Sequence, residues 1–319
     1  MPKGKGNGTQ CEWFATEFMK RTEGRYKVET YPASTLVPLG AVLDSVKKGV
    51  AEMATTPPTM FSKDLPLSQI SSMPMLGFPT RKQATLEAQR AAMGIWREFA
   101  LVPEIAAEYK PWKLAMAWFG TPSNLFSKKK EIHYPADLRG IRLAGAGPSA
   151  DLAANNGGAG VAILVPEYYE SLDKGVVDAA VMNTQMCTDW RMQTIINYYY
   201  MLDIGTGPFV LLMNLDFWKA MLPQDQKIFD DTINDMAEWG AASAQKQIAD
   251  SEKILADAGK TLTYPTPAEV VAWQRGSEVC FRKWRDDCIS MGIEAKTCDK
   301  VQNAWMALRD KYIEKYNLK

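Results

Sequence analysis

Apolar residues follow helical and strand spacing by turns along most of the chain. Helical spacing, with apolar residues three or four positions apart, covers residues 13–21, 39–48, 81–99, 148–155, 167–174 and 223–258. Apolar or alternating runs typical of strands cover residues 26–31, 50–54, 113–119, 141–144, 161–165, 176–181 and 209–213. A helical pattern returns from residue 267 onward. Strands that alternate with helices predict an α/β protein with mixed layers and mostly parallel pairing.

Two ten-residue segments of this pattern are near copies of each other. Residues 45–54 and 171–180 share Ser, two residues, Lys-Gly-Val, one residue, an acid, one residue and Ala. Each copy follows a predicted helix and precedes a predicted strand, and Gly suits a helix end because it tolerates positive φ. One copy in each half of the chain predicts two similarly built lobes with a cleft between them. The strands after the copies are expected to bring four residues to this cleft: Thr55, Thr56, Met182 and Asn183.

The composition is ordinary for a globular protein of about two domains. The chain has 319 residues, 46% hydrophobic and 23% charged, and its 37 basic and 37 acidic residues give no net charge. Without a basic stripe, a nucleic-acid partner is not expected. No apolar run approaches the roughly 20 residues that span a bilayer. The first ten residues lack the apolar core of a signal peptide, which fits a cytoplasmic protein or a mature or trimmed form equally well.

The cysteines and the histidine limit the chemistry available. The five cysteines form no C-x-x-C pair, and His133 is the only histidine, so a zinc site is not predicted. A Cys288–Cys298 bridge and free thiols both remain open. The odd number of cysteines leaves at least one unpaired in a monomer. His133 lies in a polar loop, which is more typical of a surface histidine than of a catalytic one.

A glycine-rich turn offers a second kind of site. Residues 145–150 fit the G-x-G-x-x-G/A pattern of dinucleotide sites, but they lie mid-chain after a strand of only four residues. A turn of this kind at a helix N-terminus can still bind an anion through its free N–H groups. Since no catalytic constellation accompanies it, we predict binding rather than catalysis, with no cofactor. A nucleotide-using α/β enzyme is the less favoured alternative.

Trp118 and Phe119 end a predicted strand where the chain would leave the first lobe. Side chains at the carboxyl end of a strand in an open α/β sheet face the ligand crevice. A place in the hydrophobic core is an equally good interpretation of this pair.

Several segments, in order along the chain, resemble the substrate-binding subunit of TRAP (tripartite ATP-independent periplasmic) transporters. The segments DLRGIR at 137–142, PEYY at 166–169 and LDKGVVD at 172–178 are similar to the family's DLKGLKIR, P-x-E-x-Y and L-x-x-G-V-V-D-G. Residues 21–32 and 213–223 are similar to R-T-G-G-R-V-K-V-E-V-Y-P and N-K-x-x-W-x-x-L-P. The matches extend from about residue 14 to 273.

The resemblance implies a two-lobed periplasmic-binding-protein (clamshell) fold, α/β with mixed sheets flanked by helices and a long helix from Pro223 spanning both lobes. Lobe I would hold residues 1–118 with 208–250, and lobe II residues 119–207 with 251–319. Hinge closure would trap a small organic acid, and the closed form would deliver it to an ion-gradient-driven TRAP permease. The chain would then be periplasmic, not an enzyme and not stably inserted in the membrane. A sensor subunit of the same fold, presenting its ligand to a receptor, is the alternative.

The chain departs from the family at the residue that matters most for an acid ligand. The family places an Arg four residues after the Gly of G-L-K-I-R, where it clamps the ligand carboxylate, and here that position is Ala144. A bidentate Arg–carboxylate pair is a strong recognition device, so another donor has to replace it. Arg142 lies two residues earlier and, by strand alternation, on the same side. Gly147 and Ser149 at the next helix N-terminus, and Arg191, are further candidates.

Two other departures concern the first strand and the second repeat. Only ten Gly-rich residues precede the first predicted helix, so the family's first strand is expected to be missing. The family's D-G-Q-E-N becomes DAAVM at 178–182. Together with the resemblance, the pattern predicts these ligand-binding residues: Thr55, Thr56, Trp118, Phe119, Asn124, Arg142, Ala144, Gly147, Ser149, Glu167, Tyr169, Met182, Asn183, Arg191 and Phe209.

Overall fold

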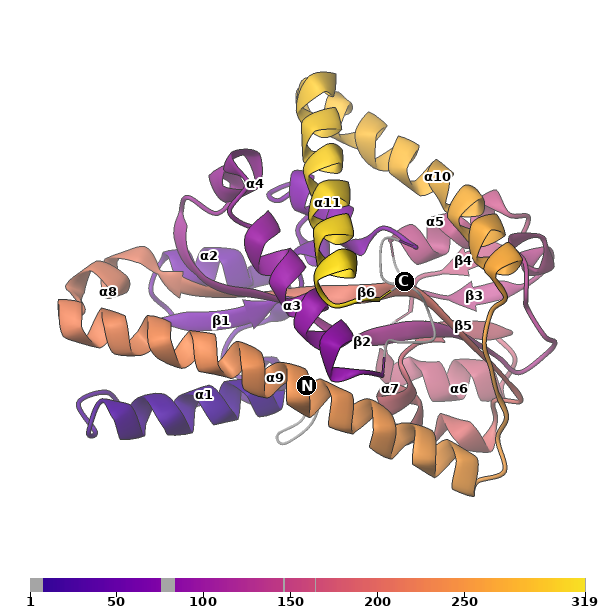
Figure 1. Ribbon diagram of the computed structural model, residues 1–319, viewed down its shortest axis with the longest axis horizontal. Coiled ribbons are helices and arrows are strands. Elements are labelled where there is room, and N and C mark those ends of the chain that lie inside the picture. The colour runs from indigo at the N-terminus through magenta and orange to yellow at the C-terminus, as the bar shows by residue number, and fades with distance from the viewer. Residues whose placement is uncertain (1–7, 76–83, 146, 164, 319) are drawn as a thin grey trace.

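A mixed β-sheet runs through both halves of the molecule (Figure 1). The computed structural model describes residues 8–75, 84–145, 147–163 and 165–318. The sheet order is β1-β6-β2-β5-β3-β4, and β7 pairs with β6. The strands are β1 (Met53–Thr56), β2 (Trp112–Ser127), β3 (Arg142–Ala144), β4 (Ala159–Val161), β5 (Ala179–Met182), β6 (Tyr198–Asn214) and β7 (Leu262–Thr263).

The strand pairing is mixed, so the expectation of mostly parallel pairing is wrong. The pairs β1–β6, β2–β6 and β2–β5 are antiparallel. The pairs β3–β4, β3–β5 and β6–β7 are parallel. The predicted α/β class with mixed sheets flanked by helices is confirmed.

Strands β2 and β6 are the two long strands that cross from one half to the other. The strand predicted to stop at Gly120 instead continues, and Pro122 pairs with Thr206. The register shifts between Leu114 and Met116, between Phe119 and Pro122, and between Ser123 and Leu125. Such irregularities bend a strand and tolerate a proline. The crossing is therefore the irregular part of the sheet.

Helices cover both faces of this sheet. They are α1 (Gly8–Arg21), α2 (Val42–Lys47), α3 (Leu86–Phe99), α4 (Pro103–Glu108), α5 (Pro148–Asn155), α6 (Tyr168–Asp173), α7 (Thr184–Asp189), α8 (Leu215–Ala220), α9 (Pro223–Asp257), α10 (Pro267–Ser290) and α11 (Ala295–Lys315). Short 3₁₀ helices include η4 (Leu67–Ser72) and η6 (Pro135–Leu138). The predicted long helix is confirmed: α9 runs beneath the sheet along both halves, with α1 beside its first part (Figure 1).

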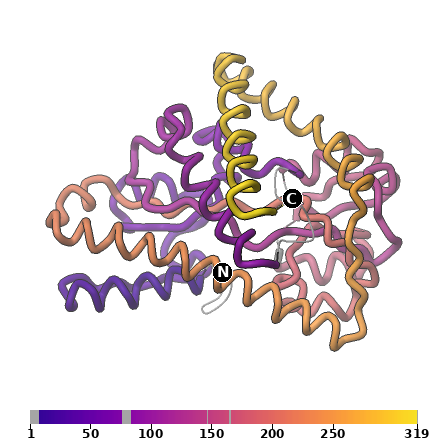
Figure 2. The backbone as a smooth tube through the Cα atoms, in the orientation of Figure 1, coloured from indigo at the N-terminus to yellow at the C-terminus, as the bar shows by residue number. Residues whose placement is uncertain are grey.

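The C-terminal helices form a hairpin that connects the two halves. Figure 2 shows the chain leaving α9 at lower right, rising past β3, β4 and β5 into α10, and returning along α11 to the centre. Helix α10 packs against α5, and α11 packs against α3. A side chain on Gly94 of α3 would collide with the ring of Tyr312, so this helix pair needs a glycine for its close approach.

Apolar side chains fill both faces of the sheet. Trp118, Phe14, Phe18 and Phe229 are buried between α1, α9 and one face. The opposite face is covered by a larger cluster that includes side chains of α3, α10 and α11. A third cluster lies under α6 and α7 in the other half. Complete burial of such a side chain contributes roughly 1.5–3 kcal/mol.

The two repeat segments build the same turn, as predicted. Gly49 and Gly175 follow the ends of α2 and α6 with φ of +72° and +68°. In the first copy the Val50 N–H donates to the Ser45 carbonyl at 2.9 Å, and in the second the Val176 N–H donates to the Ser171 carbonyl at 2.8 Å. Each of these bonds spans five residues and closes the helix end around a glycine with positive φ. It satisfies a carbonyl that the helix end would otherwise leave free.

Some predicted strands lie elsewhere. Residues 26–31 form no strand, because Tyr26 instead packs on Phe18 and Phe217 with ring centroids 5.4 and 6.5 Å apart. The strand after the first repeat, expected at 50–54, begins at Met53 and extends to Thr56. The strand expected at 161–165 is β4, which ends at Val161. Among the residues described, no helix is both long and apolar enough to span a bilayer.

Candidate ligand-binding site

The first wall of the predicted cleft contains a stacked aromatic pair. Trp118 of β2 and Phe209 of β6 are cross-strand partners, and their rings stack with centroids 5.7 Å apart. Trp118 is buried, and within the described part of the chain its indole Nε1 has no hydrogen-bond partner. Phe209 is half-buried. Because Trp118 is packed under α1 and α9, the part of this pair that a ligand could reach is the half-buried Phe209 ring.

Phe119 lies on the opposite face of the sheet, because successive strand residues alternate. It packs on Trp96 and Trp305, with centroids 6.2 and 5.8 Å away. Of the predicted pair, Phe119 thus belongs to the core against α3 and α11. The structure does not bring it together with Trp118.

The two threonines of β1 are separated in the same way. Thr55 shares a sheet face with Trp118 and forms a side-chain hydrogen bond with Cys11 of α1. Thr56 points to the other face and is 1% exposed, and its hydroxyl has no partner among the residues that the structure describes. Each threonine can line only its own side of the first wall.

The second wall is apolar where the family resemblance places a cation. Ala144 at the end of β3 and Met182 at the end of β5 are fully buried in one cluster with Tyr168 and Leu172. Asn183 caps α7: its Oδ1 accepts the Met186 N–H at 2.6 Å. The asparagine thus has a structural role that the sequence interpretation did not include.

Arg142 does not replace the missing clamp in this structure. Its guanidinium donates to both carboxylate oxygens of Asp178, from Nε at 2.9 Å and from the terminal nitrogen at 2.8 Å. The Arg142 N–H donates to the same carboxylate at 3.0 Å. These hydrogen bonds lower the pKa of Asp178 to about 2. Asp178, the acid of the second repeat, is therefore the ion-pair partner of the arginine that was expected to bind the ligand.

The N-terminus of α5 lies next to Ala144 in the chain. Gly147 opens it with φ of +54° and ψ of −130°, a conformation that favours glycine, and Pro148 occupies the first helical position. Ser149 is half-buried in the first turn. A Cβ on Gly145 would lie 3.1 Å from the Ser149 Cβ, so the chain passes close to this turn. Pro148 has no N–H, and the N–H groups of Ala150 and Asp151 donate to the Gly147 carbonyl at 2.9 and 3.1 Å. The Ser149 N–H is therefore the backbone donor of this turn that could meet an anion.

The other predicted residues lie around these walls. Arg191 is exposed and has φ of +56°. Glu167 is also exposed, and the Tyr169 hydroxyl lies 3.3 Å from Thr194 Oγ1. Asn124 is buried at the crossing of the long strands, where its Oδ1 accepts the Asp203 N–H at 3.0 Å.

Asp203 is a buried acid that the sequence analysis missed. It lies in β6 at the crossing with φ of +49°, and Thr206 Oγ1 donates to it at 3.5 Å. Loss of hydration raises its pKa to about 7. It lines a small hollow, partly open to solvent, with Gln89, Gly120, Pro122 and Thr206. An acid between Leu202 and Ile204 in an apolar strand was the available signal.

Comparison with known proteins identifies the family. The model of the bacterial extracellular solute-binding protein family 7 (DctP) matches residues 2–287. The chain belongs to family 7. A curated relative, a solute-binding protein of Albidiferax ferrireducens, is 24% identical over 268 residues, covering 82% of this chain and 76% of the relative. The resemblance to TRAP substrate-binding subunits is thus confirmed.

Solved structures share the fold of this family 7 protein. One is a marine-metagenome TRAP solute-binding protein specific for aromatic acids, with a TM-score of 0.83, 19% identity, and coverage of 98% of this chain and 96% of that chain. Another, from Rhodoferax ferrireducens, was crystallised with benzoate and has a TM-score of 0.82, 19% identity and the same coverage. The two-lobed fold predicted for this chain is therefore confirmed.

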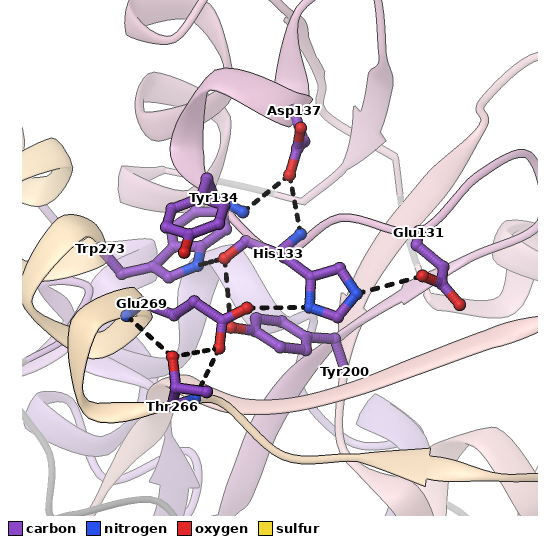
Figure 3. A network of polar contacts seen from close by, with 8 residues as sticks. All are labelled: Glu131, His133, Tyr134, Asp137, Tyr200, Thr266, Glu269 and Trp273. Carbon is purple, nitrogen blue, oxygen red and sulfur yellow. Dashed lines mark hydrogen bonds and ion pairs between the residues drawn. The ribbon is translucent and has the colours of Figure 1, made fainter.

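His133 of this solute-binding protein is part of a dense polar network (Figure 3). Its Nδ1 lies 3.0 Å from Glu269 Oε1, and its Nε2 lies 3.2 Å from Glu131 Oε2. Its carbonyl accepts hydrogen bonds from Tyr200 Oη at 3.1 Å and Trp273 Nε1 at 2.8 Å. The His133 side chain is 31% exposed, so the predicted surface position holds in part, and the loop also attaches the beginning of α10 to the sheet.

Proposed function

We propose that this family 7 protein captures a small organic acid between its lobes and delivers it to an ion-gradient-driven TRAP permease, without catalysing a reaction. The TRAP type of solute-binding protein works with membrane permeases, and the family is extracytoplasmic. We place the chain in the periplasm on that basis. The division into lobes at residues 118, 207 and 250 remains part of the proposal.

The observation that carries the ligand proposal is the positive-φ turn at Gly147, beside the buried Ala144. The N–H and the hydroxyl of Ser149, in the first turn of α5, would hold the carboxylate in place of an arginine. Phe209, stacked on the buried Trp118, would supply an aromatic surface on the other wall. We therefore favour an aromatic monocarboxylate, the class bound by the benzoate and aromatic-acid neighbours.

Isothermal titration with benzoate and benzamide, which have nearly the same shape, tests this proposal. Benzoate should bind, and benzamide should bind at least tenfold more weakly, because only the anion gains from the helix N-terminus. A Ser149→Ala variant should lose roughly threefold to tenfold in benzoate affinity, as expected for one hydrogen bond to a charged group. Binding of neutral aromatics alone would refute an acid ligand.

The sugar acids provide the necessary comparison. A solute-binding protein of Sulfitobacter was crystallised with β-D-galacturonate. If this chain bound galacturonate and not benzoate, the acid class would stand and the aromatic preference would be wrong. A thermal-shift series over both classes at one ligand concentration separates the two results, since the ligand that binds more tightly raises the apparent stability more.

A further inference from the structure

Two buried cysteine thiols meet at the tip of the C-terminal hairpin. Cys288 lies in the last turns of α10 and Cys298 in the first turns of α11. They are 1% and 0% exposed, and their side chains are hydrogen-bonded to each other. All five cysteines are free thiols in this structure. No group of three possible metal ligands occurs among the described side chains, so a metal does not explain the pair.

The backbone fixes the two thiols on neighbouring helices. The connection of α10 to α11 is short, and Gly292 adopts φ of +87° within it. The N–H groups of Met291 and Ile293 both donate to the Cys288 carbonyl at 3.1 Å. These bonds satisfy the end of α10 and hold the hairpin bend closed. The thiols therefore stay adjacent without support from either side chain.

The tip also joins the hairpin to the first half of the molecule. Trp284 Nε1 donates to the Pro66 carbonyl at 3.0 Å, and Cys288 Sγ lies 3.6 Å from the same oxygen. Cys280, in the same helix, instead points to the Pro148 carbonyl at 3.5 Å. Cys280 is buried and is not paired with another thiol in the described structure, so it provides a matched control.

We propose that Cys288 and Cys298 form a disulfide in the mature protein. The inference rests on the extracytoplasmic placement in the proposed function, because disulfides form and persist in oxidising compartments. The oxidant is a disulfide-bearing thiol oxidoreductase, or oxidised glutathione in vitro. One cysteine thiolate attacks the oxidant's disulfide and releases one thiol, and the second cysteine displaces the other. The two cysteines lose two electrons and two protons, and the oxidant becomes two thiols.

Burial determines when this bond forms. Loss of hydration raises the pKa of the Cys288 thiol to about 12 and also raises that of Cys298. Since the thiolate is the attacking species, the folded, reduced protein reacts slowly. During refolding the same thiols are exposed. We therefore expect oxidised glutathione to form the bond readily when present during refolding, and at least tenfold more slowly when added afterward.

Peptide mapping of the full chain, exported to the periplasm of a bacterial host, tests the proposal. Free thiols are alkylated under denaturing conditions before trypsin is added. Trypsin separates residues 286–296 from 297–300, and only a Cys288–Cys298 bond keeps these two peptides together. We expect this linked pair, its release by dithiothreitol, and alkylation of the remaining cysteines Cys11, Cys187 and Cys280.

Thermal unfolding gives an independent measure. Reduction should lower the Tm of the wild type by about 5 °C, since a short closed loop contributes modestly to stability. Reduction should not change the Tm of Cys298→Ser, whereas Cys280→Ser should retain the wild-type shift. Complete alkylation of all five cysteines in the periplasmic protein, or a bond to another cysteine, would overturn the proposal. Peptide mapping does not depend on ligand binding, so a negative benzoate titration would refute the ligand proposal without affecting the test of the disulfide.

Discussion

The strand crossing and the attachment of α10 to the sheet are two connections in this molecule whose polar groups are satisfied to different degrees. At the strand crossing, Asp203 is fully buried with one long hydrogen bond from Thr206. At the start of α10, Glu269 accepts hydrogen bonds from the Thr266 N–H and hydroxyl and lies 3.0 Å from His133 Nδ1. A buried acid without partners is costly, and one with several partners stabilises its surroundings. The poorly satisfied acid at the strand crossing therefore destabilises the fold there, next to the predicted cleft.

Asp203→Asn should give the largest effect and should depend on pH. The pKa of Asp203 is raised in the folded state, so the acid favours folding below its unfolded pKa near 4, and this contribution is lost as pH rises to about 7. Asparagine does not ionise. Relative to the wild type, the free energy of unfolding of the variant should rise by up to about 4 kcal/mol between pH 4 and pH 8.

Urea unfolding at several pH values measures this gain. Glu108, whose pKa burial also raises to about 7, remains in both proteins, so its contribution cancels in the difference. Equal stability differences at pH 4 and pH 8 would show that Asp203 is hydrated or paired in solution, and the contrast between the two connections would fail.

Glu269→Ala tests the satisfied connection and should cost about 2–3 kcal/mol. The change removes the capping box of α10 and leaves the Thr266 N–H and the His133 ring without their carboxylate. Glu278→Ala is the matched control, because Glu278 is exposed on the same helix and its contact with Arg282 is 4.0 Å long. The control should change the free energy of unfolding by less than about 0.5 kcal/mol. Similar losses for both variants would contradict a special role for this network.

Helices and turns could be predicted from the sequence more closely than strand pairing. The helix predicted at 148–155 matches α5 at both ends, because proline at its start and the apolar spacing are local signals. Strand direction and the extension of β2 past Pro122 depend on a partner strand more than eighty residues away, which local spacing does not contain. The repeat lies between these cases. Its glycine turn is a local signal, whereas the inference of two lobes depends on how distant segments pack.

The candidate site could be predicted only in part, because it too depends on how strands pair and which way their side chains point. Neighbouring residues were assigned together, whereas strand alternation separates Thr55 from Thr56 and Trp118 from Phe119. That error was avoidable from spacing alone. The pairing of Arg142 with Asp178 was not, because it depends on β3 and β5 lying side by side. Asp203 carried only the weak signal of one acid in an apolar run.

Of these substitutions, Arg142→Ala should change the free energy of unfolding least. It adds a half-exposed ion pair to the comparison of buried acids. The Arg142 side chain is 46% exposed and the Asp178 side chain 8% exposed, so solvent screens the pair, and its removal should lower the free energy of unfolding at pH 7 only slightly. The lowered pKa of Asp178 means that the pair stabilises the fold above the unfolded pKa near 4, and that this contribution is lost as pH falls toward 2. The variant and the wild type should therefore converge in stability at low pH. Benzoate affinity of the variant should stay within about twofold of the wild type, because Asp178 rather than the ligand holds the guanidinium. A tenfold loss would instead place Arg142 in the binding site. The α5 N-terminus would then not be needed as the anion donor.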